Sequence, residues 1–348
     1  MKKNGMKVMA MIGSAVMAAG MLAGCGNSGA AATTAAPATT AEQTTEAKAE
    51  GTTMKNNIRI TLEYDGSRYD GWQKQGNTEN TIKGKLEAVL LKMAGEEVEV
   101  HGTGRTDAGV HAKGQVANFH VDAKICPDGE TAKEYLNRYL PEDIRVLEAD
   151  LAPERFHSRL SASSKTYGYY VETGDKKNVF ERKYVYGFGK KLDLEAMRRA
   201  AGFLIGEHDF KSFCANRRMK KSTVRRIDEI KIVEHGTKIE LLYTGNGFLY
   251  NMVRIIAGTL LKVGTGEWEP EHVKEVLEAR NRKEAGQTAP AKGLTLVGIE
   301  YEREIPKEIV GRNEHWDAVL DQSKLESDGI SCVRIRFSEP EELPRLIR

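Results

Sequence analysis

The sequence predicts an α+β protein made of two tandem halves, each with the strand–helix–strand–strand–helix–strand order of ferredoxin-like and RRM-like folds. Three observations predict this class. Several segments alternate apolar and polar residues, as half-buried strands do, and others repeat apolar residues every three or four positions, as helices do. The series of strand and helix patterns occurs twice between residues 54 and 301. The composition, with 40% hydrophobic and 29% charged residues, is typical of a globular protein.

The first half, residues 54–150, begins with a strand at 58–64. A helix follows from Ile82, with Asn80 or Thr81 as its N-cap and Gly95 as its stop. The remaining elements are two strands at 98–102 and 115–121 around a glycine-rich turn, a helix at 131–140 that ends before Pro141, and a strand at 144–149.

The second half, residues 151–301, repeats this order more loosely. Its elements are a strand at 167–172, a helix at 194–205, two strands at 224–234 and 238–244, an apolar helical stripe at 249–261 and a strand at Leu294–Tyr301. The turn at 235–237 suits a hairpin between the two middle strands. We therefore expect two antiparallel sheets side by side, with a cleft between the halves.

The two ends of the chain have a different composition. Lys2 and Lys3 precede a short apolar run that closes with Leu-Ala-Gly-Cys at residues 22–25, so residues 1–25 are similar to a bacterial lipoprotein signal with Cys25 as the lipidated residue. Residues 26–53 are rich in Ala and Thr and predict a disordered tether. Residues 302–348 form an additional tail to which the sequence assigns no role.

Charge and cysteine content restrict the class of protein further. The formal net charge is +2, and the tail is acidic, so the body is mildly basic and consistent with a polyanionic partner. Cys126, Cys214 and Cys332 are scattered, without the close spacing of a zinc site. This pattern favours reduced thiols over a disulfide framework.

The most informative stretch is His-Gly-Thr-Gly-Arg-Thr-Asp-Ala-Gly-Val-His-Ala at residues 101–112. Its glycines permit backbone angles closed to other residues and a close approach of a ligand. Arg105 and Asp107 present a guanidinium and a carboxylate on the same turn. An isolated Arg-x-Asp would be read as a solvated turn whose Asp caps a short helix near Ala108. The whole stretch favours a catalytic loop.

Three further segments allow two interpretations each. Residues 64–73 combine aromatic, amide and arginine side chains that would suit RNA, or whose Tyr and Trp fold back on the core. The basic run 217–221, with Arg225 and Arg226, is a phosphate-contact surface or a solvated loop. Arg254 lies in an apolar helical stripe and would need a carboxylate or phosphate partner if buried.

Several of these motifs together resemble the bacterial tRNA pseudouridine synthases of the A type. The resemblance spans about residues 54–301, and independent motifs in the same order are more specific than any one alone. The matching segments are 62–66, 71–73, 104–112, 156–159, 165–167, 209–213, 248–254 and 289–294.

The resemblance implies isomerisation of uridine to pseudouridine at positions 38 to 40 of the tRNA anticodon stem-loop, by a homodimer without cofactor or metal. Asp107 matches the family's catalytic aspartate, and Arg105 matches the arginine that fills the space left by the flipped uridine. A pairing of Arg105 with Asp107 would lower the pKa of the carboxyl and keep it charged. Tyr167 matches the tyrosine that stacks on the uracil, and Leu249 and Arg254 match residues that line the same pocket.

The leader conflicts with this activity, because a protein anchored through Cys25 would be exported away from tRNA. We favour a cytoplasmic enzyme, translated from Met54 or joined to its leader by an accidental or assembly-derived fusion. The alternative is a lipid-anchored, non-catalytic protein that binds another polyanion on the same fold. An RNA-binding chaperone is a milder alternative, and replacement of Asp107 would separate it from an enzyme.

Overall fold

A computed structural model describes residues 54–76, 78–175, 179–216 and 218–301. These residues belong to one unit of the chain. The predicted leader (1–25), tether (26–53) and tail (302–348) lie outside the described residues, so those three predictions stay as they are.

The first half has the predicted element order. β1 (Lys55–Tyr64) pairs antiparallel with β3 (His111–Asp122) and β4 (Ile144–Leu151), and the short β2 (His101–Gly102) pairs with β3. The helices are α1 (Ile82–Ala94) and α2 (Gly129–Tyr139). Thr81 caps α1 by accepting from the N–H of Gly84, and Gly95 ends the helix with φ 72°, so both predicted signals are confirmed. The predicted strand at 98–102 is wrong for residues 98–100.

The second half contains the predicted elements in the predicted order, and adds three that were not predicted. It consists of β5 (Ala162–Glu172), β6 (Tyr186–Gly187), α3 (Leu194–Gly202), β7 (Gly206–Asp209), β8 (Val224–His235), β9 (Lys238–Gly245), α4 (Met252–Gly264), α5 (His272–Ala279) and β10 (Leu294–Tyr301). The three additional elements are β6, β7 and α5. α4 begins three residues after the predicted stripe, because residues 249–251 form a turn. α5 was not predicted, although its residues Val273, Val276 and Leu277 have helical spacing and are buried.

The two predicted sheets join into one. The strand order is β4-β1-β3-β10-β5-β9-β8-β7. β10 pairs parallel with β3 at Thr295–His111 and Leu296–Ala112, whereas β2 occupies the opposite end of the same edge of β3, at Ala117 and Asn118. Because β2 is only two residues long, the start of β3 is left open to the last strand of the second half.

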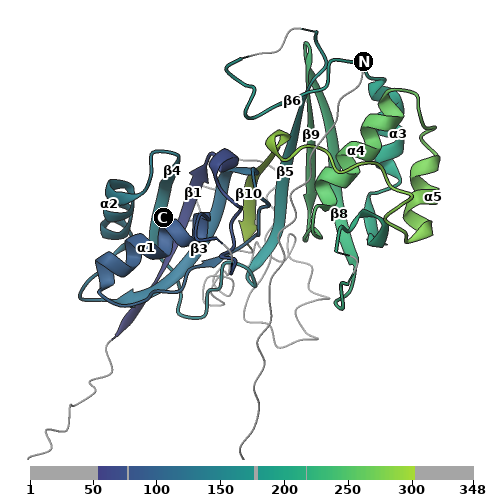
Figure 1. Cartoon of the computed structure of the whole chain (residues 1–348). Helices are drawn as coiled ribbons and strands as arrows, with labels where there is room; N and C mark the ends of the chain where they lie inside the picture. Colours follow the sequence, from purple (N-terminus) through teal and green to yellow (C-terminus); the bar gives the residue numbers. More distant parts are fainter. Residues whose placement is uncertain (1–53, 77, 176–178, 217, 302–348) are drawn as a thin grey trace, which may run out of the picture. The chain divides into compact units, whose positions relative to one another are not determined.

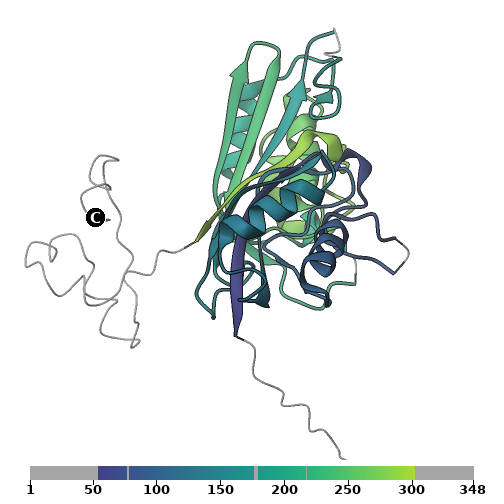
Figure 2. The same ribbon diagram turned by 90° about the vertical axis from the view of Figure 1, so that its left-hand side faces the viewer.

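Helices cover each half separately. α2 packs on β1 and β4 beside α1, whereas α4 packs on β5 and against α3, and α5 lies beside α3 and β7. Figure 1 shows these two groups of helices at opposite ends of the sheet, and Figure 2 views the sheet from the side of α1 and α2. The largest fully buried side chains are Trp72, Tyr169, Tyr243, Phe119, Phe210 and Phe213. Within the described ranges, no helix is long and apolar enough to cross a membrane.

Candidate active site

The glycine-rich stretch forms a loop, residues 103–110, between β2 and β3, and its backbone is held from several sides. The N–H of Trp72 donates to the carbonyl of Thr106 at 3.0 Å, and the N–H of Gly109 donates to the carbonyl of Tyr69 at 3.2 Å. The hydroxyls of Tyr64 and Thr106 share a hydrogen bond of 2.8 Å. These bonds tie the 103–110 loop to the segment that follows β1.

Glycines let the two segments approach this closely. A Cβ on Gly71 would lie 2.6 Å from the carbonyl oxygen of Thr106, and a Cβ on Gly102 would lie 2.3 Å from the ring of Trp72. Tyr64, Tyr69 and Trp72 are only 4%, 4% and 1% exposed. The three rings fold back on the core, so the core interpretation of the Tyr and Trp side chains in residues 64–73 is confirmed. Their function is to support the 103–110 loop.

Asp107 lies opposite Arg254 of α4. Nη1 of Arg254 donates to Oδ2 of Asp107 at 3.3 Å, and the two side chains are 16% (Arg254) and 20% (Asp107) exposed. The expectation that Arg254 would need a carboxylate or phosphate partner is confirmed by this ion pair. The pair joins the loop of the first half to the helix of the second.

The position of Arg254 is fixed by two further bonds. Its Nε donates to the carbonyl of Ala289 at 2.7 Å, and its Nη1 donates to Oδ1 of Asn251 at 2.8 Å. Asn251 has φ 60°, a left-handed conformation that costs energy for a residue with a side chain. Asn251 was not expected as a site residue, although it lies within the matching segment 248–254. Its strained conformation places its side-chain oxygen beside the guanidinium.

The carboxyl of Asp107 lies in a less polar environment than the expected pairing with Arg105 implied. Burial raises its pKa above the ordinary value of 3.8, and the charge and hydrogen bond of Arg254 oppose that rise without cancelling it. Arg105 is exposed and has no ion pair within the described part of the chain. The expected pairing of Arg105 with Asp107, which would have lowered this pKa, is therefore wrong. Arg105 is exposed to solvent, whereas the side chain of Asp107 contacts Arg254 of α4.

Tyr167 lies against the same loop. It is 7% exposed, and a Cβ on Gly104 would lie 3.2 Å from its hydroxyl oxygen. Its ring packs edge-on against Phe248 at 5.3 Å between centroids, and Leu249, the next residue, is buried. Among the described residues the hydroxyl of Tyr167 has no hydrogen-bond partner. Burial raises its pKa, with a smaller contribution from the charge of Asp107, so the hydroxyl stays protonated.

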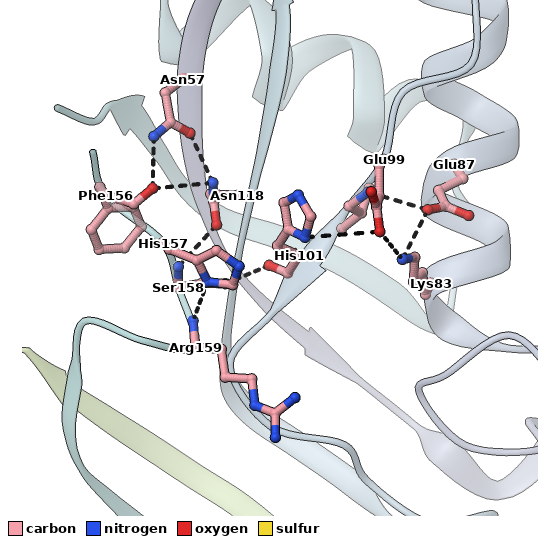
Figure 3. A network of polar contacts seen from close by, with 11 residues as sticks. Asn57, Lys83, Glu87, Glu99, His101, Asn118, Phe156, His157, Ser158 and Arg159 are labelled. Atoms are coloured by element: carbon pink, nitrogen blue, oxygen red, sulfur yellow. Dashed lines mark hydrogen bonds and ion pairs between the residues drawn. The ribbon is translucent and has the colours of Figure 1, made fainter. Parts of the chain in front are cut away.

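A polar network fastens the segment 153–159 beside β2 (Figure 3). Nδ2 of Asn57 donates to the carbonyls of Pro153 and Phe156, and Nδ2 of Asn118 donates to Oδ1 of Asn57. The hydroxyl of Ser158 donates to the carbonyl of His101, at the start of the glycine-rich stretch. These side chains are buried, so their bonds are needed to offset desolvation. The network holds β2 in place ahead of the loop.

Lys220 and Lys221 of the basic run lie away from the residues of this site. A hollow of about 580 Å³ is lined by Lys211, Lys220 and Lys221 together with residues 280–283, and includes none of Asp107, Tyr167 or Arg254. Arg226 lies on β8, where its exposed side chain pairs with Asp228 at 2.7 Å. Cys126 and Cys214 are buried free thiols, as predicted. No group of three or more His, Cys, Asp or Glu in the described ranges is placed to hold a metal ion.

Comparison with known proteins covers the region that carries this site. A family model described as tRNA pseudouridine synthase matches residues 60–160 and 200–302. A tRNA pseudouridine synthase A of Bacillus sp. (strain KSM-64) is 48% identical over 246 residues, 71% of this chain and 100% of that protein. A tRNA pseudouridine synthase A 1 of Clostridium tetani is 47% identical over 245 residues, 70% and 99% of the two chains. A solved Cbf5-Nop10-Gar1 complex matches with a TM-score of 0.27 and 11% identity, over 69% and 48% of the chains, too weakly to support an argument.

Proposed function

The chain belongs to the tRNA pseudouridine synthase family, and from this premise we propose that it isomerises uridine at positions 38 to 40 of the tRNA anticodon stem-loop, with Asp107 as the catalytic residue. The enzyme is an isomerase, an intramolecular transferase, acting on tRNA. The observation that supports the role of Asp107 is its position: a half-buried carboxylate on a glycine-rich loop, paired with Arg254 and close to Tyr167.

The reaction moves the uracil ring without adding or removing atoms. The bond from N1 to the sugar carbon C1′ breaks, a bond from C5 to C1′ forms, C5 loses a proton and N1 gains one. A carboxylate can form a covalent bond to the detached fragment or stabilise its charge. Asp107 supplies that group, and Arg254 keeps the carboxylate ionised against the effect of burial. The hydroxyl of Tyr167, which stays protonated, is the candidate to relay this proton: it can accept the proton from C5 while it gives its own proton to N1.

The other site residues have supporting roles in this proposal. The target base must leave the helical stack before it can reach a half-buried carboxylate. Arg105 is exposed on the 103–110 loop, where it can enter the space that the base leaves. Tyr167 stacks on the uracil, and Leu249 and Arg254 line the pocket beside it. The proposal includes a homodimer and neither cofactor nor metal.

We place this activity in the cytoplasm, because tRNA is found there. Anchoring through Cys25 is the alternative, and it requires that the leader is translated and processed. Comparing the mass of the mature N-terminus in cells with the masses expected for starts at Met1 and at Met54 decides between the two. A lipidated Cys25 would contradict the cytoplasmic location.

A non-catalytic polyanion-binding protein is the alternative function. It is less well supported, because a half-buried carboxylate at the centre of the site repels phosphate groups and would weaken simple binding. A catalytic site needs the carboxylate despite its repulsion of phosphate, whereas a surface that only binds phosphate has no use for it. The same argument applies to an RNA chaperone on this fold.

The test is release of tritium from 5-labelled uridine in an unmodified tRNA transcript, with the full chain and its Asp107→Asn variant. Release by the wild type and none by Asp107→Asn, with RNA binding retained, is the expected result. A folded wild-type protein that binds the transcript without release would overturn the proposed activity. Sequencing the product for pseudouridine at positions 38 to 40 tests the proposed positions separately.

A further inference from the structure

A second group of charged residues lies at the other end of the 103–110 loop from the Asp107–Arg254 pair. Lys165 is on β5, two residues before Tyr167, so the two side chains lie on the same face of the strand. Its Nζ donates to the carbonyl of Thr103 at 2.9 Å. Within the described residues it has no carboxylate partner, and the charges that act on it are those of Arg159 and Arg225.

Arg225 approaches Lys165 across two neighbouring strands. Lys165 is opposite Gly245 of β9, and Gly245 is opposite Ile227 of β8, two residues from Arg225. Gly245 has no side chain to separate them, and a Cβ there would lie 2.4 Å from the carbonyl oxygen of Arg226. The bonds that Arg225 makes inside the described ranges all use Nη1. Its Nε and Nη2 can therefore donate to a ligand.

Arg159 follows Ser158, which is tied to the same end of the loop. The hydroxyl of Tyr301 bonds both to the carbonyl of Ser158 at 2.9 Å and to the hydroxyl of Thr103 at 2.6 Å. The backbone N–H of Arg159 donates to Nδ1 of His157, and Ser158 is also tied to Asn118 and His101. Figure 3 shows the guanidinium of Arg159 extending away from this network, with no bond to the residues drawn there. The backbone is held in place while the charge is presented outward.

This cationic group adjoins the site of reaction. Thr103, which accepts the bond from Lys165, is the first residue of the 103–110 loop. The side chain of Arg225 passes 3.8 Å from the position of a Cβ on Gly247, next to Phe248, whose ring packs on Tyr167. A ligand held by the three cations would therefore lie beside a base stacked on Tyr167.

We propose that Lys165, Arg159 and Arg225 form a subsite for one phosphodiester of the RNA strand, next to the uridine that enters the site. The proposal rests on the proposed function and specifies how its substrate is held. Like charges near one another are mutually repulsive, and a phosphate group bound to them reverses the sign of that interaction. Two guanidiniums and an ammonium also match the several acceptor oxygens of a phosphodiester better than a single carboxylate.

The subsite has a clear use in this reaction. A base can rotate out of the stack only if its backbone is held, and phosphate contacts set the position of a nucleic acid without reading its sequence. Because Lys165 also bonds to Thr103, the phosphate and the loop that carries Asp107 are linked by one side chain. Binding the backbone and positioning the carboxylate would then occur together.

The test uses synthetic anticodon-arm RNAs in which one phosphate at a time, near the target uridine, is replaced by an uncharged methylphosphonate. Affinity is measured with the full chain carrying Asp107→Asn, alone and combined with Arg225→Met or Arg159→Met. Lys231→Met is the matched control, because Lys231 is an exposed cation on the same strand as Arg225, paired with Glu229 at 3.0 Å.

We expect one methylphosphonate position to lower the affinity about tenfold, equivalent to about 1.4 kcal/mol. In the Arg225→Met and Arg159→Met proteins, the methylphosphonate at that position should lower the affinity much less, since the charge that contacts the phosphate is gone. The control should keep the full tenfold loss. The subsite would be overturned if the losses of affinity from methylphosphonate and from the protein variant simply added at every position. It would also be overturned if no methylphosphonate position lowered the affinity. Tritium release by the wild type on the unmodified RNA is measured in parallel, so failure of the activity is seen separately.

Lys165 needs its own variants because it also contacts the loop. Lys165→Arg keeps the charge and should retain affinity, whereas Lys165→Met should lower affinity and kcat together. Burial, with Arg159 and Arg225 nearby, lowers the pKa of Lys165 to about 8, so the lysine is charged below that pH and neutral above it. RNA affinity should therefore fall as the pH rises past 8 in the parent protein and remain level with Lys165→Arg. An equal fall in both would contradict the role of Lys165.

Discussion

The two halves have the same element order but build their central hairpins differently. In the second half, β8 and β9 pair along most of their length and are joined by a tight turn in which Gly236 has φ 64°. In the first half, β2 stops after two residues and the chain makes the 103–110 loop before β3 begins. The paired hairpin is a rigid framework, whereas the interrupted one exposes a carboxylate. The comparison shows how one architecture can carry chemistry in one copy and support it from the other.

The contribution of each half can be separated by mutation, beginning with the carboxylate of the interrupted hairpin. Asp107→Asn should lower kcat by on the order of 10⁴-fold or more, because the amide cannot act as a nucleophile or carry the negative charge. RNA affinity should change little. Asp228→Asn on β8 is the matched control and should retain activity, since Asp228 pairs only with exposed Arg226 at the surface. Tritium release measures both, and substantial turnover by Asp107→Asn would contradict the assignment.

The next largest effect should come from the framework side of the site. Tyr167→Phe keeps the ring and removes the hydroxyl, which has no partner within the described residues. If that hydroxyl moves the proton at C5, kcat should fall about 100-fold with little change in RNA affinity. Tyr170→Phe, on the opposite face of β5, serves as the control. Unchanged kcat in Tyr167→Phe would limit Tyr167 to stacking on the base.

Removing the ion pair between the halves should produce a smaller loss with a characteristic pH dependence. Arg254 lowers the pKa of Asp107 against the effect of burial, so Arg254→Gln should raise that pKa further. Activity depends on the ionised carboxylate, and it should therefore be lost at a higher pH on the acidic side of the profile. On the acidic limb of the profile we expect kcat about tenfold below wild type, and the difference should shrink as the pH rises and both carboxyls become ionised.

The pH–rate profiles of Arg254→Gln and Arg254→Lys provide the check. The lysine variant keeps the charge, so its acidic limb should lie closer to that of the wild type. If the activity of Arg254→Gln falls at the same acidic pH as that of the wild type, Arg254 does not set the ionisation of Asp107.

The smallest effects concern stability of the framework. Tyr243 is fully buried on β9, and its hydroxyl has no hydrogen-bond partner in the described structure, whereas the hydroxyl of Tyr169 donates to the carbonyl of Pro290 at 2.9 Å. Tyr243→Phe should raise the free energy of unfolding by about 1 kcal/mol, and Tyr169→Phe should lower it by about 1 kcal/mol. Urea unfolding of the full chain measures both. A loss of stability in Tyr243→Phe would indicate a partner for that hydroxyl.

Much of the fold could be predicted because its signals are local. The strand and helix order, the Thr81 cap and the Gly95 stop follow from the spacing of apolar residues and from capping chemistry within a few residues. α5 was not predicted because it is short and its N-cap residue, Glu271, makes no side-chain hydrogen bond that would mark the start of a helix. The length of β2 was also misjudged, since residues 98–100 alternate like a strand but lack a partner in the sheet.

The sequence by itself determined the order of the main strands and helices in both halves, the glycine-rich loop with Asp107, and the need of a buried Arg254 for an anionic partner. Only the tertiary structure decided that this partner is Asp107, far away in the chain, and that Arg105 turns to solvent. It also decided that the rings of residues 64–73 pack into the core, and that Lys165, two residues before Tyr167 on β5, donates to the carbonyl of Thr103. The pairing of β3 with β10 joins the two halves in one sheet and so brings residues from both halves together. Charge pairing depends on distance in space, whereas local sequence patterns report only neighbours along the chain.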